Sequence, residues 1–433
     1  PPRPCDAGEE VGMTASSLQT PALTPKRVRV KPSLFSEASG KTAAFALNFK
    51  ARGSALYSVG GRKFCKQLPA GASKLFCTED GTLFVWTGSA LIAGGNTFPL
   101  SEAPLEVLSF SGEAGKEYYA LTSSGLVCLG EGAVSGAPAG STAALFGERL
   151  FIASGETLFY SAPLAPKDWA QSADGSGSVV LPSAGGNILK LVPDRGRLLL
   201  FRERGVTALS APGDFLGFEA EELPCAVEGL MPSSVARCGS RVLFCSKEGI
   251  FSLKGETLSR LSGCGEERIA FQRGVSAVSA GERYYAAVTL KDGEKCILEI
   301  EGEGAALYRL EAESLAGGKF RFLKEGSLYA LDEEAAGDKE AVLEFPLSTF
   351  GLFKVRYLNA LLIEGEGLFR AELRAEPCAG APMPAPRFVR GRAGEEVRLN
   401  PPMRGSAFAL KVRFLSAGAK LSAVTLTLRE GKA

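Results

Sequence analysis

Residues 147–154 read Gly-Glu-Arg-Leu-Phe-Ile-Ala-Ser, and residues 155–160, which follow directly, read Gly-Glu-Thr-Leu-Phe-Tyr. Both segments are short, apolar and rich in residues that favour strands, and apolar side chains recur at every second position. A glycine opens each segment, and glycine readily takes the positive φ of a tight hairpin turn. The stretch therefore predicts two antiparallel strands whose alternate residues face opposite sides of a sheet.

The same plan recurs along the chain, with a second clear hairpin at residues 239–252. Its signature is a small residue followed by an aliphatic and an aromatic or second aliphatic residue. Successive instances are about 39 residues apart on average, close to the roughly 40–50 residues of a four-stranded propeller blade. The instances are Ser54–Tyr57, Gly81–Phe84, Ser124–Val127, Glu156–Phe159, Gly205–Ala208, Gly249–Phe251, Lys295–Leu298 and Gly326–Tyr329.

These repeats predict an all-β chain with a β-propeller of about seven blades over residues 43–345. A single blade cannot bury both of its faces, whereas a ring of blades covers them and leaves only short edges exposed. A pair of β-sandwiches is the structural alternative, because the spacing of the instances is irregular.

The segments on either side of the repeats have a different character. Residues 1–42 are rich in Pro, Ser and Thr, which predicts an extended N-terminal arm. Residues 346–433 predict a C-terminal β-sandwich-like module, interrupted by the proline-rich stretch Pro377–Pro386. Its expected strands are Leu358–Ile363, Gly367–Leu373, Glu396–Leu399, Ala407–Phe414 and Leu421–Leu428.

The composition excludes several kinds of catalytic and metal-binding site and identifies none. The 433 residues include no histidine, which excludes Ser-His-Asp and Cys-His relays and every His-ligated metal. Glu/Asp pairs, lysine Schiff bases, Ser-Lys dyads and all-cysteine metal sites remain open. The ten cysteines include no CxxC pair, and several lie in apolar strand-like runs, so we expect reduced thiols rather than disulfides or zinc. No catalytic, cofactor-binding or metal-binding residue is predicted.

Charge is balanced overall but not locally. The 49 Lys and Arg residues against 48 Asp and Glu give a net charge of +1, so no sequence-specific binding to nucleic acid is expected. No signal segment or membrane span is expected either. Two basic regions are candidates for interaction, and residues 332–344 form an acidic segment of opposite charge. Their residues are Lys26, Arg27, Arg29 and Lys31 in the arm, and Arg387, Arg390 and Arg392 in the C-terminal module.

Aromatic and acidic residues leave a carbohydrate-related function open. Trp169, one of two tryptophans, is a candidate interaction residue, although a tryptophan in a propeller loop usually serves packing. With Tyr284 and Tyr285 it could stack on sugar rings, and a pair of carboxylates could cleave a glycosidic bond. Runs of acids on loops are more often simply solvated.

Residues 141–262 resemble the propeller of virion proteins of tailed phages and prophages, including tail nozzle and hub proteins. The resemblance is carried by Phe146–Ser154, Leu158–Pro163, Asp168–Trp169, Val180–Pro182, Gly185–Leu189, Leu191–Pro193, Arg197–Arg204 and Gly249–Phe251. Residues 404–410 and 423–428 are similar to the closing strands of such proteins.

The resemblance implies a non-enzymatic tail component, assembled in the bacterial cytoplasm and located in the virion. It also implies a homo-oligomeric ring around the DNA path, which leaves proximity to packaged DNA open, with other tail or connector proteins as partners. The basic regions would then pair with acidic loops on adjacent copies. A carbohydrate-binding or glycan-cleaving propeller is the main alternative, and a peptide-binding scaffold is a third.

Overall fold

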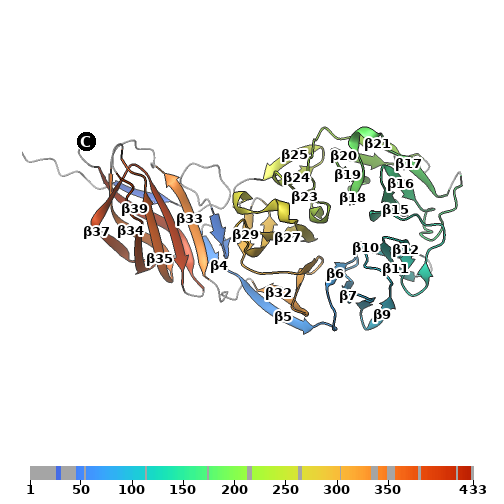
Figure 1. Ribbon diagram of the computed structural model, residues 1–433, viewed down its shortest axis with the longest axis horizontal. Coiled ribbons are helices and arrows are strands. Elements are labelled where there is room, and N and C mark those ends of the chain that lie inside the picture. Colours follow the sequence, from blue (N-terminus) through green and yellow to red (C-terminus); the bar gives the residue numbers. More distant parts are fainter. Residues whose placement is uncertain are drawn as a thin grey trace, which may run out of the picture.

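The computed structural model shows an all-β molecule with two parts, a ring of sheets and a β-sandwich (Figure 1). Its only helices are short 3₁₀ turns within the described residues. No helix in these ranges is long and apolar enough to cross a membrane. The structure describes residues 26–30, 45–52, 55–112, 115–172, 175–211, 217–261, 266–302, 304–332, 340–348, 356–378, 382–415 and 418–430.

Seven four-stranded antiparallel sheets, the blades, form the ring within these ranges. The first strands of neighbouring blades contact one another, so they line the ring axis and the fourth strands lie outermost. In order, the blades are blade 1, β6 (Lys74–Cys77), β7 (Leu83–Trp86), β8 (Ala90–Ala93) and β9 (Asn96–Pro99); blade 2, β10 (Glu106–Gly112), β11 (Gly115–Thr122), β12 (Gly125–Cys128) and β13 (Gly132–Ala133); blade 3, β14 (Thr142–Phe146), β15 (Arg149–Ser154), β16 (Thr157–Tyr160) and β17 (Gly177–Val180); blade 4, β18 (Ile188–Asp194), β19 (Arg197–Arg202), β20 (Gly205–Ser210) and β21 (Glu219–Glu222); blade 5, β22 (Ala236–Cys238), β23 (Arg241–Ser246), β24 (Gly249–Lys254) and β25 (Thr257–Leu261); blade 6, β26 (Ser276–Ala280), β27 (Arg283–Thr289), β28 (Lys295–Glu301) and β29 (Gly304–Tyr308); and blade 7, β30 (Ser314–Ala316), β31 (Arg321–Lys324), β32 (Ser327–Asp332) and β5 (Gly61–Gln67).

The hairpin of blade 3 confirms the prediction from residues 147–160. Gly147 and Glu148 form the two-residue turn with φ of 53° and 61°, the backbone that a type I′ hairpin needs. Along β15, Ile152 packs toward blade 2 and Phe151 toward blade 4. Alternate residues of one strand therefore pack into two different blade interfaces, so the apolar core continues from blade to blade.

Six of the eight predicted repeat instances fall on the third strands of blades 2 to 7. The other two do not. Gly81–Phe84 leads into the second strand of blade 1, whose third strand is β8. Ser54–Tyr57 belongs to β4 (Ala55–Ser58), which is part of the sandwich. A small–aliphatic–aromatic cluster marks a buried strand after a turn, and it does not show which sheet that strand joins.

The ring is closed by a strand from before the first blade. Strand β5 pairs antiparallel with β32 as the outermost strand of blade 7, although more than 250 residues separate Gln67 from Ser327. Hydrogen bonds between the two ends of the propeller thus hold the ring shut, and β5 covers the outer edge of β32.

The sandwich consists of a six-stranded and a five-stranded antiparallel sheet in the described residues. Phe369, Val412 and Leu426 lie in its buried core. The six-stranded sheet contains β3 (Phe49–Arg52), β4, β39 (Lys420–Glu430), β34 (Arg356–Glu366) and β37 (Glu396–Gly405), with β1 (Lys26–Val30) beside β39; the five-stranded sheet contains β2 (Phe45–Leu47), β33 (Ala341–Ser348), β38 (Phe408–Phe414), β35 (Leu368–Ala375) and β36 (Arg387–Arg392).

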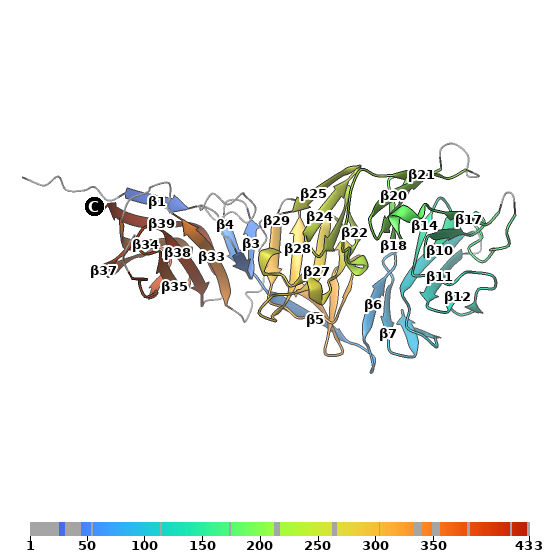
Figure 2. The ribbon, with the colours of Figure 1, turned by 45° about the horizontal axis from the view of Figure 1, so that its top comes forward.

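Strand pairing draws the domain boundaries differently from the expected 1–42, 43–345 and 346–433. The propeller spans residues 61–332 and is inserted into the sandwich, which takes strands from both sides of it. Figure 2 shows the sandwich beside blade 6, with β3 next to β29. The short apolar segments at 45–58 resemble blade strands in sequence. Their partners lie far away in the sequence, since Phe45 of β2 pairs with Glu344 and Tyr57 of β4 pairs with Lys420. Most of the expected N-terminal arm, residues 1–25 and 31–42, lies outside the described residues; its described part is β1.

Candidate functional site

The junction between the two domains is built around Asn48, a buried residue with φ of 57° between β2 and β3. Its backbone N–H donates to the Leu307 carbonyl of blade 6 at 2.7 Å. Its side-chain oxygen accepts from the Arg309 N–H at 2.7 Å, and its side-chain amide donates to the Glu340 carbonyl at 3.1 Å. Asparagine tolerates left-handed backbone and offers both a donor and an acceptor, so one residue links β2, β29 and the approach to β33.

Glu299 of blade 6 forms the second connection. Its carboxylate, 1% exposed, accepts from the ammonium of Lys50 in β3 at 2.8 Å and from the hydroxyl groups of Tyr285 and Tyr308. The Arg283 guanidinium lies 3.5 Å away. A buried carboxylate is stable only when cations and donors surround it, so Lys50 of the sandwich completes a polar cluster of the propeller.

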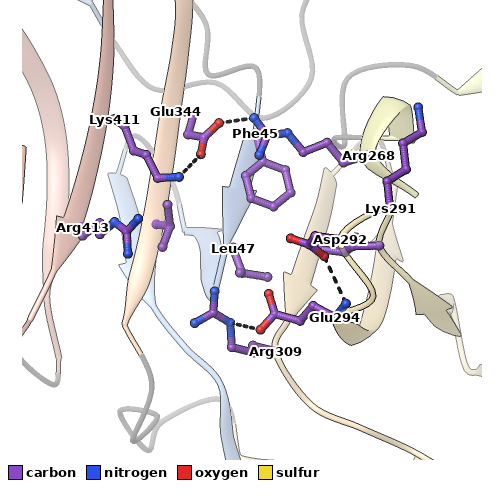
Figure 3. A pocket seen from close by; sticks show the side chains of 12 residues that line it. Phe45, Leu47, Arg268, Lys291, Asp292, Glu294, Arg309, Glu344, Lys411 and Arg413 are labelled. Atoms are coloured by element: carbon purple, nitrogen blue, oxygen red, sulfur yellow. Dashed lines mark hydrogen bonds and ion pairs between the residues drawn. The ribbon is translucent and has the colours of Figure 1, made fainter. Parts of the chain in front are cut away.

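A pocket of about 330 Å³ opens along this junction (Figure 3). Phe45 and Leu47 of β2 line its apolar side. Around them, Glu344 accepts from the Lys411 ammonium at 2.6 Å and from the Arg268 guanidinium, which also lies over the Phe45 ring. The sandwich supplies Glu344 and Lys411, and the propeller supplies Arg268. These charges therefore join the two domains across the pocket.

On the opposite side of the pocket, charged residues of the propeller pair with one another. The Arg309 guanidinium pairs with Glu294 at 2.5 Å, and the Asp292 carboxylate accepts from the Glu294 N–H at 3.0 Å. Glu344 and Asp292 thus accept hydrogen bonds within the protein, and Glu294 is ion-paired with Arg309. These contacts hold the charged lining of the pocket in place.

The outer face of the five-stranded sheet carries a row of three arginines. Arg390 of β36 lies opposite Arg370 of β35, which lies opposite Arg413 of β38. Arg413 pairs with Glu340 at 3.3 Å. Arg370 and Arg390 are exposed, and neither has an ion-pair partner in the described part of the chain. We call these three residues the arginine row.

Like charges directly opposite one another on adjacent strands weaken a sheet. The arginine row contains two such contacts, and further exposed groups on the same face are Arg392 and Phe388 of β36 and Leu368 of β35. A fold that accepts this repulsion at a solvent-facing surface presents planar donors that suit carboxylates or phosphates. The arginine row is therefore the best candidate for an interaction surface.

Sequence analysis found this surface in part. Arg390 and Arg392 lie on it, whereas Arg387 points to the other side of β36 and donates to the Pro401 carbonyl. Arg370 and Arg413 were missed. Alternation within the segments 367–373 and 407–414 would have placed each of them on the polar face of a strand, but only tertiary pairing brings them together.

The basic arm lies elsewhere. Lys26, Arg27 and Arg29 belong to β1, which pairs with β39 of the other sheet, and Lys31 lies outside the described residues. The exposed Arg27 guanidinium is 3.9 Å from Glu396.

Part of the acidic segment 332–344 is occupied by contacts within the chain. Glu340 and Glu344 are engaged by Arg413, Arg268 and Lys411 of the same chain, and residues 333–339 lie outside the described ranges.

Trp169 has a packing role in the structure. Its half-buried ring packs against the core between blades 2 and 3, and its indole N–H donates to the Pro166 carbonyl at 2.9 Å. Tyr284 and Tyr285 are 0% and 4% exposed. These two rings offer no accessible face on which a sugar could stack.

One group of side chains has the composition of a metal site. Glu117, Cys128 and Glu131 place ligand atoms within 4.8 Å of one another. The Lys167 ammonium lies 2.7 Å from Glu117 and 2.8 Å from Glu131, and these hydrogen bonds raise the pKa of Lys167. A lysine thus supplies the positive charge that a cation would otherwise provide. Burial raises the pKa of the Cys128 thiol.

Near the propeller axis, Glu106 connects the inner strands of blades 2, 3 and 4. It accepts from the Lys190 ammonium at 2.5 Å and from the Thr142 hydroxyl at 2.7 Å. Burial lowers the pKa of the nearby Lys74, an effect that Glu106 opposes and Lys190 reinforces. Lys74 donates to the Pro104 carbonyl, so these charges tie the inner strands together.

The fold and these surfaces define a β-propeller protein with an attached sandwich. No protein-family model matches the sequence, and no curated protein matches it. Among solved structures, that of streptogramin B lyase is similar with a TM-score of 0.42 and 12% identity, over 63% of this chain and 97% of that chain. The extracellular domain of the putative hybrid two-component system BT4673 from B. thetaiotaomicron has a TM-score of 0.43 and 10% identity, over 72% of this chain and 43% of that chain. The blade number and order follow from the strand pairing itself.

Proposed function

We propose that the protein is a non-enzymatic structural component of a phage tail or tail-like particle, with a nozzle-like or hub-like position. The observation that carries the proposal is the buried junction, in which Asn48, Lys50 and Glu299 join the propeller to the sandwich. Such a junction suits a part that must resist mechanical force, because separating the domains would leave buried polar groups without partners. The assignment to a phage tail or tail-like particle rests on the resemblance of residues 141–262 to tail proteins.

The arginine row gives this component a docking surface. Its partner in the proposal is an acidic surface of a neighbouring tail or connector protein. Arginine binds carboxylates through two parallel hydrogen bonds, so Arg370 and Arg390 would fix the orientation of the neighbour as well as hold it.

Particles from the source bacterium test the proposal. Particles would be purified on a density gradient, and the protein would be located by mass spectrometry and by immunogold electron microscopy. We expect a fixed number of copies per particle at the tail, and tails that are absent or shortened when the gene is deleted. Purified particles that lack the protein, and complete tails made without it, would overturn the proposal.

A further inference from the structure

Two outermost blade strands are exposed along almost their whole length and carry opposite charges. Strand β5 of blade 7 presents Arg62, Lys63 and Lys66, and every residue from 62 to 67 is exposed. Strand β21 of blade 4 has the sequence Glu-Ala-Glu-Glu, and all four residues are exposed. Each strand ends its sheet, so each presents a row of backbone N–H and C=O groups toward solvent.

The other outer strands differ. Strand β29 is covered by strands of the sandwich, β9 ends in Pro99, and β13 is two residues long. Strand β17 (Gly-Ser-Val-Val) has no charged residue, and β25 has only Arg260. Lys63 and Lys66 make no ion pair within the described residues, and neither do Glu219 and Glu221.

The charges select one kind of edge pairing over the others. Two β5 edges would bring lysines against lysines, and two β21 edges would bring glutamates against glutamates. Only β5 against β21 is attractive, so the same charges that prevent symmetric pairing favour the unlike pair. We infer that β5 of one copy adds to β21 of the next copy as an antiparallel strand, which joins copies of this chain head to tail.

The register of the two strands fits this pairing. Lys63 lies opposite Ala330 and Lys66 opposite Leu328, because a bulge leaves Cys65 as an extra residue in β5. The two lysines therefore share one face of blade 7, two register steps apart. Glu219 and Glu221 lie opposite Ser210 and Ala208 and are also two steps apart on one face. Antiparallel addition can thus pair Lys63 with Glu221 and Lys66 with Glu219.

The two edges lie on different sides of the ring, with blades 5 and 6 between them on one side and blades 1 to 3 on the other (Figure 1). A contact between unlike edges leaves a free β5 and a free β21 at the two ends of every open assembly. Repetition gives a ring if the successive rotations close and a filament if they do not. The inference rests on the proposed function, because it states how the homo-oligomeric ring of that proposal would form.

Charge exchange between the two strands tests the pairing in the full-length protein. Sedimentation velocity and light scattering would follow assembly of the wild type, of Lys63→Glu/Lys66→Glu and of Glu219→Lys/Glu221→Lys. We expect the wild type to assemble at about 0.1 M salt and to dissociate at about 1 M, where charges are screened within roughly 3 Å. Each double variant alone should bind itself at least about 100-fold more weakly. An equimolar mixture of the two should assemble again with strict alternation, because each supplies the edge that the other needs.

Circular dichroism would establish that the variants are folded, and Lys254→Glu/Lys319→Glu, which changes two exposed lysines outside both edge strands, is the matched control. A wild type that stays monomeric at low salt overturns the inference, as does a mixture that fails to assemble although both folded variants are present. Particles that contain the protein while charge exchange has no effect would refute this contact and leave the tail function standing. Charge-dependent assembly of a protein that particles lack would do the reverse.

Discussion

Asn48 forms hydrogen bonds at the contact between the domains and also takes a left-handed backbone conformation. Two substitutions separate these two roles. Asn48→Gly keeps the left-handed backbone and removes the side-chain hydrogen bonds to Arg309 and Glu340, which we expect to cost about 1–3 kcal/mol of unfolding free energy. Asn48→Ala loses the same bonds and adds backbone strain, for about 1–2 kcal/mol more. Urea denaturation of the three proteins measures both differences. Equal stability of the alanine and glycine variants would show that the left-handed backbone is unimportant.

Asp80, in the turn between β6 and β7, predicts a pH dependence of stability. Burial would raise the pKa of its carboxyl, but hydrogen bonds from Lys116, Thr78 and Thr82 outweigh it and lower the pKa. A carboxyl whose pKa is lower in the folded state stabilises the fold above its unfolded pKa of about 3.9, and the contribution disappears as pH falls through the folded-state pKa. Asp80→Asn should therefore be less stable than the wild type at neutral pH, and the difference should shrink in acid. Urea denaturation at several pH values tests this, and a pH-independent difference would contradict it.

Among the elements, strands β35, β36 and β38 carry the arginine row, where stability and docking are expected to conflict. Arg370→Gln removes repulsion from both Arg390 and Arg413, so we expect the free energy of unfolding to rise by about 0.2–1 kcal/mol. The same change should reduce incorporation into particles when the variant replaces the wild type. Arg374→Gln on the same face is the control, because Arg374 pairs with Glu372 and its loss should not stabilise the sheet. If Arg370→Gln is less stable than the wild type, other contacts already offset the repulsion among the three arginines.

At the scale of the whole molecule, insertion of the propeller into the sandwich predicts which fragments can fold. Residues 59–332 contain all seven blades with the closing strand β5, so this fragment should fold, with lower stability because β29 loses its cover. Residues 1–348 keep the propeller but leave β2 and β33 without the rest of their sheet, and this fragment should aggregate. Circular dichroism and thermal denaturation of the two purified fragments test the expectation. A soluble, cooperatively folding 1–348 fragment would show that the sandwich does not need its C-terminal half.

The prediction of the blades succeeded where it relied on local pattern. Alternation around Phe151 and Ile152 and the turn at Gly147 act within a few residues, so the sequence indicates them directly. The eight described cysteines are unpaired, and five of them are buried. The five expected C-terminal strands are all present, and β36 was missed because its alternating arginines lie next to a proline-rich stretch.

The sequence by itself determined the strand pattern, the all-β class and the approximate number of blades, because each depends on periodicity and turn residues close together in the chain. Tertiary structure decided that β2, β3 and β4 belong to the sandwich, that Lys50 reaches Glu299, and that Arg370, Arg390 and Arg413 form one row. These features depend on which strands pair across long stretches of chain. Strand register is chosen by packing of the complete core, and no local pattern contains that information.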